Sequence, residues 1–415
     1  MLEIADGLRA WCERGEPFAV ATVAAVHGSA PRRPGAAMAV DAAGSVLGSV
    51  SGGCVESEVY ELCRAALDGG TPGLHRFGYD DDSALGAGLT CGGSVEVFVQ
   101  RIDPARPAPG LALRDAAARR PVALVRIVAG PARLLGRALA VRAGDGRPGA
   151  VAPGTVTSGA VTSGAVTSGA VTSGAVAPGT VAPGTVTSGA VTPGTVVGTL
   201  GERAADRAAV DAARALLRTG RTRTVLVPTA DGPATALVEV SAPAPRLLIF
   251  GSTDFAVALA PVGAHLGYRV TVCDARPVFT TADRFPGADE VVVAWPDRYL
   301  RDTATDERTA VCVLTHDLRF DVPLLRDALR MPLGYVGAMG SRRTHGERMS
   351  ALRAEGLTEA ELGRLHSPIG LDLNACSPEE TAVSIVAEII AHRNGATATP
   401  LGGSALAIHR EPARS

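Results

Sequence analysis

The sequence predicts an α/β protein in which an N-terminal α/β domain with an internal duplication precedes a C-terminal doubly wound parallel sheet. Residues 46–70 and 196–220 align without gaps, which indicates the duplication. From Arg246 onward, short apolar runs alternate with helical segments, as is typical of parallel β-α units. Hydrophobic residues make up 46% of the chain and aromatic residues only 4%, so we expect cores of Val, Leu and Ala.

Each of the two aligned stretches contains a short β-type run, a break and a helical segment that ends at Gly70 or Gly220. Upstream, residues 20–40 resemble residues 123–141 with small gaps. We therefore predict two copies of a β-β-β-α unit. At 415 residues the chain is long enough for two or three domains. The predicted divisions are residues 1–104 and 105–244 for the two copies, 245–395 for the parallel sheet and 396–415 for a tail.

Residues 151–195 are nine consecutive pentapeptides, each with one Val and a Pro-Gly or Ser-Gly pair. These pairs favour successive turns, and one Val per unit is too little to form a core. We predict a flexible insertion in the loop between two strands of the second copy, where added length has a small entropic cost. A short β-solenoid is the alternative.

The net charge of −2 provides no electrostatic reason to expect binding to nucleic acid or to an anionic membrane. The N-terminus lacks the pattern of a signal peptide, and no apolar run is long enough to cross a bilayer. The seven cysteines are scattered without a C-x-x-C pair, which argues against a disulfide framework and a structural zinc site. We therefore expect a cytoplasmic protein.

The stretch VSGGCVES contains the first candidate site, Gly52, Gly53 and Cys54. We expect Cys54 in the first turn of a helix, where the helix dipole favours the thiolate. The amides of the two glycines would then suit a phosphate or another oxyanion. The second copy has Glu202-Arg203-Ala204 at these positions, so close backbone approach is needed only in the first copy. Inert packing of a buried thiol is the alternative.

Two further features of the first half could belong to the same site. Cys91 also precedes two glycines, and two thiols with glycine neighbours suggest a soft, anionic ligand. Arg32, in a loop between two prolines, could offer its guanidinium group to an anion, or could be solvated surface. The cysteines predicted to be packing residues within apolar helices or strands are Cys12, Cys63, Cys273 and Cys312.

The first turn of the C-terminal sheet departs from the dinucleotide-binding pattern G-x-G-x-x-G/A. It begins at Gly251 and has Asp274 about 20 residues later, where a ribose-binding acid is expected. Thr253 replaces the central glycine and adds a side chain where a phosphate would lie. Thr253 and Asp254 are both good helix N-caps, so the helix needs no ligand. We expect weak or no NAD(P) binding.

Ligands of such sheets lie beyond the carboxyl ends of the strands. His316 and Asp317 follow the fourth predicted strand, and Gly340, Ser341 and Arg342 follow the fifth, where a helix opens. We expect these residues to converge on one crevice with the nucleotide turn. A helix start with arginines could bind an anion there; a tight turn with surface arginines has equal weight.

Several stretches together carry a resemblance to a known family. They are GSAPRRPGAAMAV, GSVSGGCVESEVY, LTCGGSVEV, GYRVTVCDARPVFTTADRFPGADEVVVAWPDRYL, VLTHDLRFDVPLLRDAL, YVGAMGSRRTH and PIGLDLNACSPEETAVSIVAEIIAHRNG. The chain resembles the XdhC/CoxI family of xanthine dehydrogenase accessory proteins over nearly everything but the pentapeptides and the last dozen or so residues. Family members typically have Gly-Ala-Gly-His-Val in the nucleotide turn of their Rossmann-like domain, where this chain has Gly-Ser-Thr-Asp-Phe.

The resemblance implies a maturation factor for a molybdenum hydroxylase. Such a factor binds the molybdopterin cofactor, protects it during sulfuration and transfers it to the apo-enzyme, without turnover of its own. It implies that Gly52, Gly53, Cys54 and Cys91 hold the cofactor, with Cys54 near the metal. The expected partner is the apo-enzyme; a cysteine desulfurase and a second copy of the chain are further candidates. The alternatives are an NAD(P)-dependent oxidoreductase, with His316 or Asp317 as acid/base, and a paralogue that acts through protein contacts alone.

Overall fold

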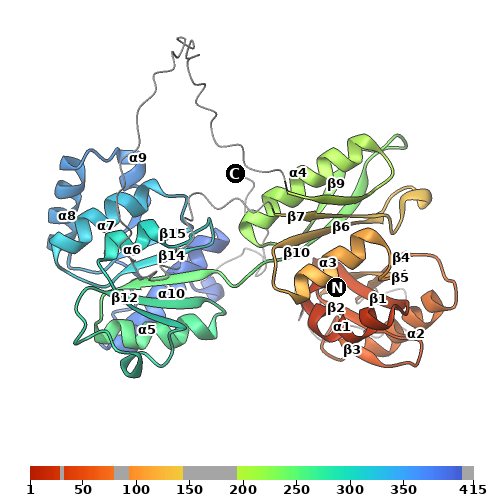
Figure 1. The fold of residues 1–415 in the computed structure, drawn as a ribbon, viewed down its shortest axis with the longest axis horizontal. Coiled ribbons are helices and arrows are strands. Elements are labelled where there is room, and N and C mark those ends of the chain that lie inside the picture. The colour runs from red at the N-terminus through yellow and green to blue at the C-terminus, as the bar shows by residue number, and fades with distance from the viewer. Residues whose placement is uncertain (29–31, 79–92, 144–193, 404–415) are drawn as a thin grey trace, which may run out of the picture.

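The computed structural model describes residues 1–28, 32–78, 93–143 and 194–403, which form three β-sheets with helices on their faces (Figure 1). Two five-stranded antiparallel sheets belong to the N-terminal half, and a six-stranded parallel sheet belongs to the C-terminal half. This arrangement confirms the predicted fold class. Short 3-10 turns lie at Leu2–Ile4, Ala132–Leu134, Ala282–Arg284 and Leu401–Gly403.

The two copies of the duplicated unit have the same strand order. In the first sheet it is β3-β2-β1-β5-β4, and in the second it is β8-β7-β6-β10-β9. The first copy consists of α1 Ala5–Arg14, β1 Phe18–His27, β2 Ala37–Val40, β3 Val46–Gly48, α2 Glu56–Leu67, β4 Gly73–Phe77 and β5 Ser94–Ile102. The second consists of α3 Pro107–Ala117, β6 Val122–Ala129, β7 Ala138–Arg142, β8 Val196–Thr199, α4 Arg203–Thr219, β9 Arg223–Val227 and β10 Ala234–Ser241. The repeating unit is therefore α-β-β-β-α-β-β, larger than the β-β-β-α unit predicted.

The pentapeptide array lies outside the described residues, but the strands on either side of it are described. Strands β7 and β8 pair antiparallel in neighbouring positions of the second sheet. Their counterparts in the first copy, β2 and β3, also pair antiparallel and are joined by residues 41–45. The array thus interrupts a hairpin connection, as the sequence predicts.

The two N-terminal sheets share one hydrophobic core. Helices α1 and α3 contact each other, and their apolar residues form one core with inward-facing residues such as Phe18 of β1 and Leu124 of β6. Helix α2 covers the outer face of the first sheet, with Val59 and Cys63 in its core. Helix α4 covers the outer face of the second sheet through Ala205, Ala209 and Ala213. These alanines recur every four residues and form one helical stripe.

A buried ion pair lies where the two N-terminal sheets meet, and sequence reasoning missed it. Arg126 of β6 and Glu239 of β10 are 0% and 2% exposed, and Arg126 Nη2 lies 2.5 Å from Glu239 Oε2. Arg126 also donates to the hydroxyl of Thr22 on β1 at 2.8 Å and lies over the ring of Phe98 on β5. A single charge within each of the apolar runs VALVRIVA and ALVEVS was the available signal.

The C-terminal half is a doubly wound sheet with strand order β13-β12-β11-β14-β15-β16. Its strands are β11 Arg246–Phe250, β12 Arg269–Asp274, β13 Glu290–Val293, β14 Ala310–Val313, β15 Tyr335–Ala338 and β16 Leu365–His366. Its helices are α5 Asp254–His265, α6 Pro296–Asp302, α7 Leu318–Arg330, α8 Arg342–Ala354, α9 Glu359–Leu362 and α10 Pro378–Asn394. Helices α5 and α10 contribute to the core on one face, and α7 and α8 to the core on the other. The chain order reverses between β11 and β14, which is where such sheets bind ligands.

Candidate functional site

The Gly52-Gly53-Cys54 stretch forms a loop between β3 and α2 rather than the first helical turn. Helix α2 begins at Glu56 with Val55 as its N-cap, so Cys54 lies two residues before the helix. Cys54 is half-buried and contacts the core beneath α2. The prediction that places this thiol in the first turn is therefore wrong by about half a turn.

The backbone amides that were expected to bind an oxyanion donate to the carboxylate of Glu56 instead. The carboxylate accepts hydrogen bonds from Gly52 N–H at 3.0 Å and from Gly53 N–H at 2.8 Å. It also accepts from the backbone N–H of Ser51 at 2.9 Å and from the hydroxyl of Ser49 at 2.6 Å. Partial burial acts to raise the pKa of Glu56, but these hydrogen bonds outweigh it and lower the pKa to about 2. The expectation of available amides is thus corrected: the chain supplies its own anion.

The two glycines are required by backbone conformation. Gly52 has φ +80° and Gly53 has φ +123°, in the region that residues with a side chain rarely adopt. A Cβ added at either position would meet no atom of the described residues within 4 Å. Their role is therefore to shape an open loop, since no described part of the chain approaches them. The space beside them is accessible to a ligand.

The second copy shows what the loop replaces. Asp206 is aligned with Glu56, and it accepts from the hydroxyl of Thr199 at 2.7 Å and from Leu200 N–H at 2.6 Å. The acid and its hydroxyl donor are thus present in both copies. Helix α4, however, begins at Arg203, three positions earlier in the alignment than α2. The glycines with left-handed φ therefore unwind one helical turn and leave Cys54 in a loop.

We predict that Glu56→Gln destabilises this loop. A partly buried carboxylate with several charge-assisted hydrogen bonds contributes roughly 1–2 kcal/mol here, because part of the group is solvated. Since the folded-state pKa is depressed, this contribution is present above the ordinary Glu pKa of 4.5 and is lost as pH falls toward about 2. Urea unfolding of wild type and variant at pH 7 and pH 4 should show a difference that shrinks in acid. Glu58→Gln, in the same first turn but exposed, is the control. An unchanged difference between the two pH values would contradict the role of Glu56.

The other predicted residues of the N-terminal half do not join this loop. Cys91 lies outside the described residues. Arg32 pairs with Glu3 at 2.8 Å, while its neighbour Arg33 lines a cavity on another side of the molecule. The cysteines assigned to packing lie in α1, α2, β12 and β14, and burial raises the pKa of Cys63 and of Cys273 to about 12. Thiols with such pKa values are poor nucleophiles and poor metal ligands.

The nucleotide turn of the C-terminal half satisfies its own polar groups. Ser252 N–H donates to Asp274 at 2.7 Å, and Arg276 pairs with the same carboxylate at 2.7 Å. Burial acts to raise the pKa of Asp274, but Arg276 and the Ser252 amide outweigh it, so the pKa is lowered. The Thr253 hydroxyl caps α5 by accepting from Ala256 N–H, as predicted. The acid expected to bind a ribose is therefore engaged by an arginine.

The packing of two neighbouring strand ends requires a glycine at position 251, which the motif does not reveal. Its φ is +116°, and a Cβ there would lie 2.8 Å from Thr315 Cγ2 and 3.1 Å from backbone atoms that follow β14. The glycine thus allows two neighbouring strand ends to approach each other closely. This contact explains Gly251 without a pyrophosphate.

The remaining predicted residues lie at the carboxyl ends of β14 and β15. Asp317 is the N-cap of α7 and pairs with Arg319 at 2.6 Å, which lowers the pKa of Asp317 to about 2. Ser341 is the N-cap of α8 and accepts from Thr344 N–H at 3.1 Å. His316 and Arg342 adjoin these caps, and Gly340 precedes Ser341 with φ +155°. The predicted residues share this edge of the sheet, but both helix starts are capped by the protein itself.

A buried ion pair lies just beneath this edge and was not predicted. Asp321 of α7 and Arg348 of α8 are both fully buried, with Arg348 Nη2 2.7 Å from Asp321 Oδ2. Arg348 also donates to the carbonyl of Met339 at 2.9 Å, and Thr315 donates to Asp321. The pair connects the ends of β14 and β15 to both helices. No motif marks it in the sequence.

Helix α2, which the Gly-Gly-Cys loop precedes, and helix α8, which begins beside the predicted crevice residues, lie on opposite sides of the molecule (Figure 1). Helix α2 contacts β1, β2 and β5 of its own sheet, on the side away from the C-terminal half. Within the described ranges, no three His, Cys, Asp or Glu side chains come together as a metal site requires. One ligand of ordinary size therefore cannot contact both regions in this arrangement.

Comparison with known proteins decides the family. A model described as the XdhC and CoxI family matches residues 11–78, and a model described as the XdhC Rossmann domain matches residues 247–389. The chain belongs to the XdhC and CoxI family. The match to the second model covers the whole parallel sheet from β11 into α10.

One known relative matches nearly the whole of this chain, and another matches about a third of it. A probable xanthine dehydrogenase subunit from Bacillus subtilis (strain 168) is 27% identical over 388 residues, which are 93% of this chain and 96% of the relative. The molybdenum cofactor insertion chaperone PaoD of Escherichia coli (strain K12) is 30% identical over 151 residues, 36% of this chain and 41% of PaoD. A crystal structure of a xanthine dehydrogenase from Bacillus halodurans, 21% identical, superposes with a TM-score of 0.58 over 97% of this chain and 98% of that one. This last likeness shows the shared fold.

The family member has no helix, in the part of the chain that the structure describes, with the length and apolarity to span a bilayer.

Proposed function

We propose that this protein is a maturation factor for a molybdenum hydroxylase of the xanthine dehydrogenase type. It would bind the molybdopterin cofactor as cargo, assist its sulfuration together with a cysteine desulfurase, and transfer it to the apo-enzyme. Family membership supports this role, as do the names of the relatives from B. subtilis and E. coli. The protein would act as a chaperone and not as an enzyme with turnover of its own.

The observation that carries the proposal is the open loop that ends at Cys54. Two glycines with left-handed φ unwind a helical turn that the second copy retains, and the space beside them is open. The result is a half-buried thiol next to an accessible surface. Thiolate is a soft ligand suited to a molybdenum centre or to a transferable sulfur. We assign Cys54 the contact with the metal or its sulfur, and Gly52 and Gly53 the shaping of the approach.

The loop fits the metal side of the cofactor better than its phosphate. The amides of Gly52 and Gly53 already donate to the Glu56 carboxylate, so a phosphate would have to displace that group. The backbone N–H of Cys54 donates to the Ser51 hydroxyl at 2.9 Å, which fixes the position of the residue in the loop. Glu56 thus holds the loop in shape, and the soft group that the loop presents is the thiol. Cys91 is proposed as a second thiol of the site on the basis of its motif alone.

The alternative of an NAD(P)-dependent oxidoreductase is less well supported. Asp274 is engaged by Arg276 and Ser252, and the start of α5 is capped by Thr253. A dinucleotide would have to break these contacts to gain the usual ribose and pyrophosphate hydrogen bonds. We retain His316, Gly340, Ser341 and Arg342 as candidate contacts for cargo or partner at this edge.

We expect Cys54→Ser to abolish cofactor delivery while leaving the fold intact, because Cys54 lies in a loop. The variant and wild type would each be purified without oxygen after co-expression with the apo-hydroxylase. Molybdenum and pterin content of the factor, and sulfurated cofactor in the hydroxylase, are the readouts. Cys376→Ser, an exposed cysteine before α10, is the matched control. A Cys54→Ser protein that still carries the cofactor and activates the hydroxylase would contradict the role assigned to Cys54.

A further inference from the structure

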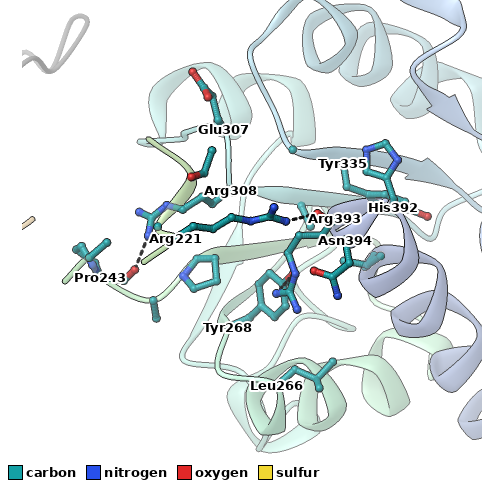
Figure 2. Close-up of a pocket in the computed structure, with 18 of the residues that line it drawn as sticks. Arg221, Pro243, Leu266, Tyr268, Glu307, Arg308, Tyr335, His392, Arg393 and Asn394 are labelled. Atoms are coloured by element: carbon teal, nitrogen blue, oxygen red, sulfur yellow. Dashed lines mark hydrogen bonds between the residues drawn. The ribbon is translucent and has the colours of Figure 1, made fainter. Parts of the chain in front are cut away.

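A cavity of about 650 Å³ lies between the second copy of the duplicated unit and the C-terminal half (Figure 2). One wall is formed by the end of α4 and the segment that joins β10 to β11. The other is formed by the end of α10 and the first residues of β14 and β15. The cavity therefore lies at the amino-terminal edge of the parallel sheet, opposite the crevice that the sequence predicts.

The charged residues of this cavity are mainly arginines: Arg33, Arg221, Arg308 and Arg393, with Glu307 as the carboxylate. Glu307 pairs with Arg218, and Arg308 pairs with Asp306 at 2.6 Å. Among the described residues, no carboxylate pairs with the three other arginines. The cavity thus carries an uncompensated positive charge from three guanidinium groups.

Arg221 shows the mutual repulsion of these groups most directly. Burial lowers its pKa, and the positive charges of Arg223 and Arg393 lower it further. Arg221 donates one hydrogen bond to the carbonyl of Arg393, and Arg393 donates one to the hydroxyl of Tyr268 at 3.4 Å (Figure 2). Since a guanidinium group has five N–H donors, both retain several for another acceptor. A bound anion would relieve the repulsion and take up these donors.

We propose that this cavity binds an organic phosphate or pyrophosphate of nucleotide size. Three guanidinium groups match the charge of a pyrophosphate, and arginines bind phosphate oxygens in bidentate pairs. The volume falls in the range of small-molecule sites, and the exposed ring of His392 in its wall provides surface for an aromatic ring. A nucleotide and a pterin phosphate share this chemistry. The proposal holds whether or not Cys54 binds the molybdenum cofactor.

Binding would also join three parts of the chain. Arg33 belongs to the first copy, Arg221 to the segment before β9 in the second copy, and Arg393 to the C-terminal half. A ligand held by all three links both N-terminal copies to the parallel sheet. Ligand binding to the folded state alone raises thermal stability. The melting temperature is therefore a second readout, independent of the heat of binding.

The test is calorimetry and thermal unfolding of the full chain with inorganic pyrophosphate. We expect saturable binding that weakens as NaCl rises from about 0.1 M to about 1 M, since the contacts are ionic. Arg221→Gln and Arg393→Gln should each weaken binding about tenfold, the loss expected for one charge-assisted contact. Arg298→Gln removes one exposed arginine of α6 and should change nothing. Competition by ATP and by a pterin phosphate then distinguishes the two ligand sources.

Two outcomes would overturn the proposal. One is the absence of heat and of any melting shift with pyrophosphate, ATP and the pterin phosphate at millimolar concentration. The other is binding that Arg221→Gln and Arg393→Gln leave unchanged. Arg221 donates a hydrogen bond to the end of α10, so Arg221→Gln could loosen the fold. In that case Arg33→Gln replaces it as the test variant, because the Arg33 side chain is exposed.

Discussion

Glu239→Gln is expected to lower the free energy of unfolding of the N-terminal half by about 3–5 kcal/mol. The substitution leaves the guanidinium group of Arg126 fully buried without its carboxylate. The glutamine amide oxygen can still accept a hydrogen bond, but the amide is neutral, so the charges of Arg126 and of the Met1 amino group, which also pairs with Glu239, are no longer balanced. Glu239 also accepts from Leu2 N–H at 3.3 Å, and that contact weakens with it.

The measurement uses the two tryptophans of the chain as separate probes. Trp11 is buried in α1, and Trp295 lies in the C-terminal half against Phe320. In a Trp295→Phe background, urea unfolding followed by fluorescence reports the N-terminal half. The double variant Arg126→Met/Glu239→Met should recover part of the loss, because apolar side chains replace the Arg126–Glu239 pair while the buried amino group of Met1 still loses its carboxylate. Glu359→Gln, which breaks an exposed pair with Arg353, should have little effect.

The pH dependence of this effect follows from the direction of the pKa shift. Burial acts to raise the pKa of Glu239, but Arg126 and the amino group of Met1 outweigh it, and the pKa is lowered. The stabilising contribution is therefore present above the ordinary Glu pKa and is lost as pH falls through the folded-state value. The difference between wild type and Glu239→Gln should diminish in acid. A stability difference below about 1 kcal/mol at pH 7 would contradict the role of the pair.

Arg348→Met is expected to destabilise the C-terminal half by a similar amount, about 3–5 kcal/mol. It leaves the Asp321 carboxylate fully buried with only the Thr315 hydroxyl as a side-chain donor among the described residues. It also removes the hydrogen bond to the Met339 carbonyl at 2.9 Å. That carbonyl adjoins Gly340, so the variant should loosen the edge where the predicted crevice residues lie.

In a Trp11→Phe background, Trp295 reports unfolding of this half. Arg348→Met is made in both single-tryptophan backgrounds. It should shift the transition that Trp295 reports to lower urea and leave the transition that Trp11 reports unchanged. Arg342→Met, an exposed arginine at the start of α8, is the control. Equal shifts of both transitions would show that the two halves unfold together and that the ion pair is not local to one of them.

Patterns between near neighbours in the chain predicted much of the fold. The β-α alternation after Arg246 depends on which residues face a core, so it identifies the parallel sheet without long-range information. The N-cap Thr253 was recognisable for the same reason, since a cap contacts residues two or three positions away. The duplication was visible because both copies keep the same apolar positions. The repeat also includes α1 and α3 at its start and two strands at its end, which lie outside the aligned stretches.

The functional residues were harder to predict, and Glu56 shows why. Its position three residues after Gly53 is local, but two glycines beside a helix start suggest available amides until the fold shows the carboxylate among them. The left-handed φ of Gly52 and Gly53 keeps residues 52–54 in a loop, whereas the sequence placed Cys54 in the first helical turn. Whether Cys54 binds the molybdenum cofactor stays a prediction.

Spacing and backbone preference within a few residues were enough to determine the parallel sheet, the helix caps, the duplication and the unusual Gly-Gly-Cys stretch. Which charges meet was decided by the packed structure. Arg126 and Glu239 are far apart in the sequence, and so are Arg33, Arg221 and Arg393. Their proximity depends on how sheets and domains pack, and packing is set by the summed burial of many side chains rather than by any local motif.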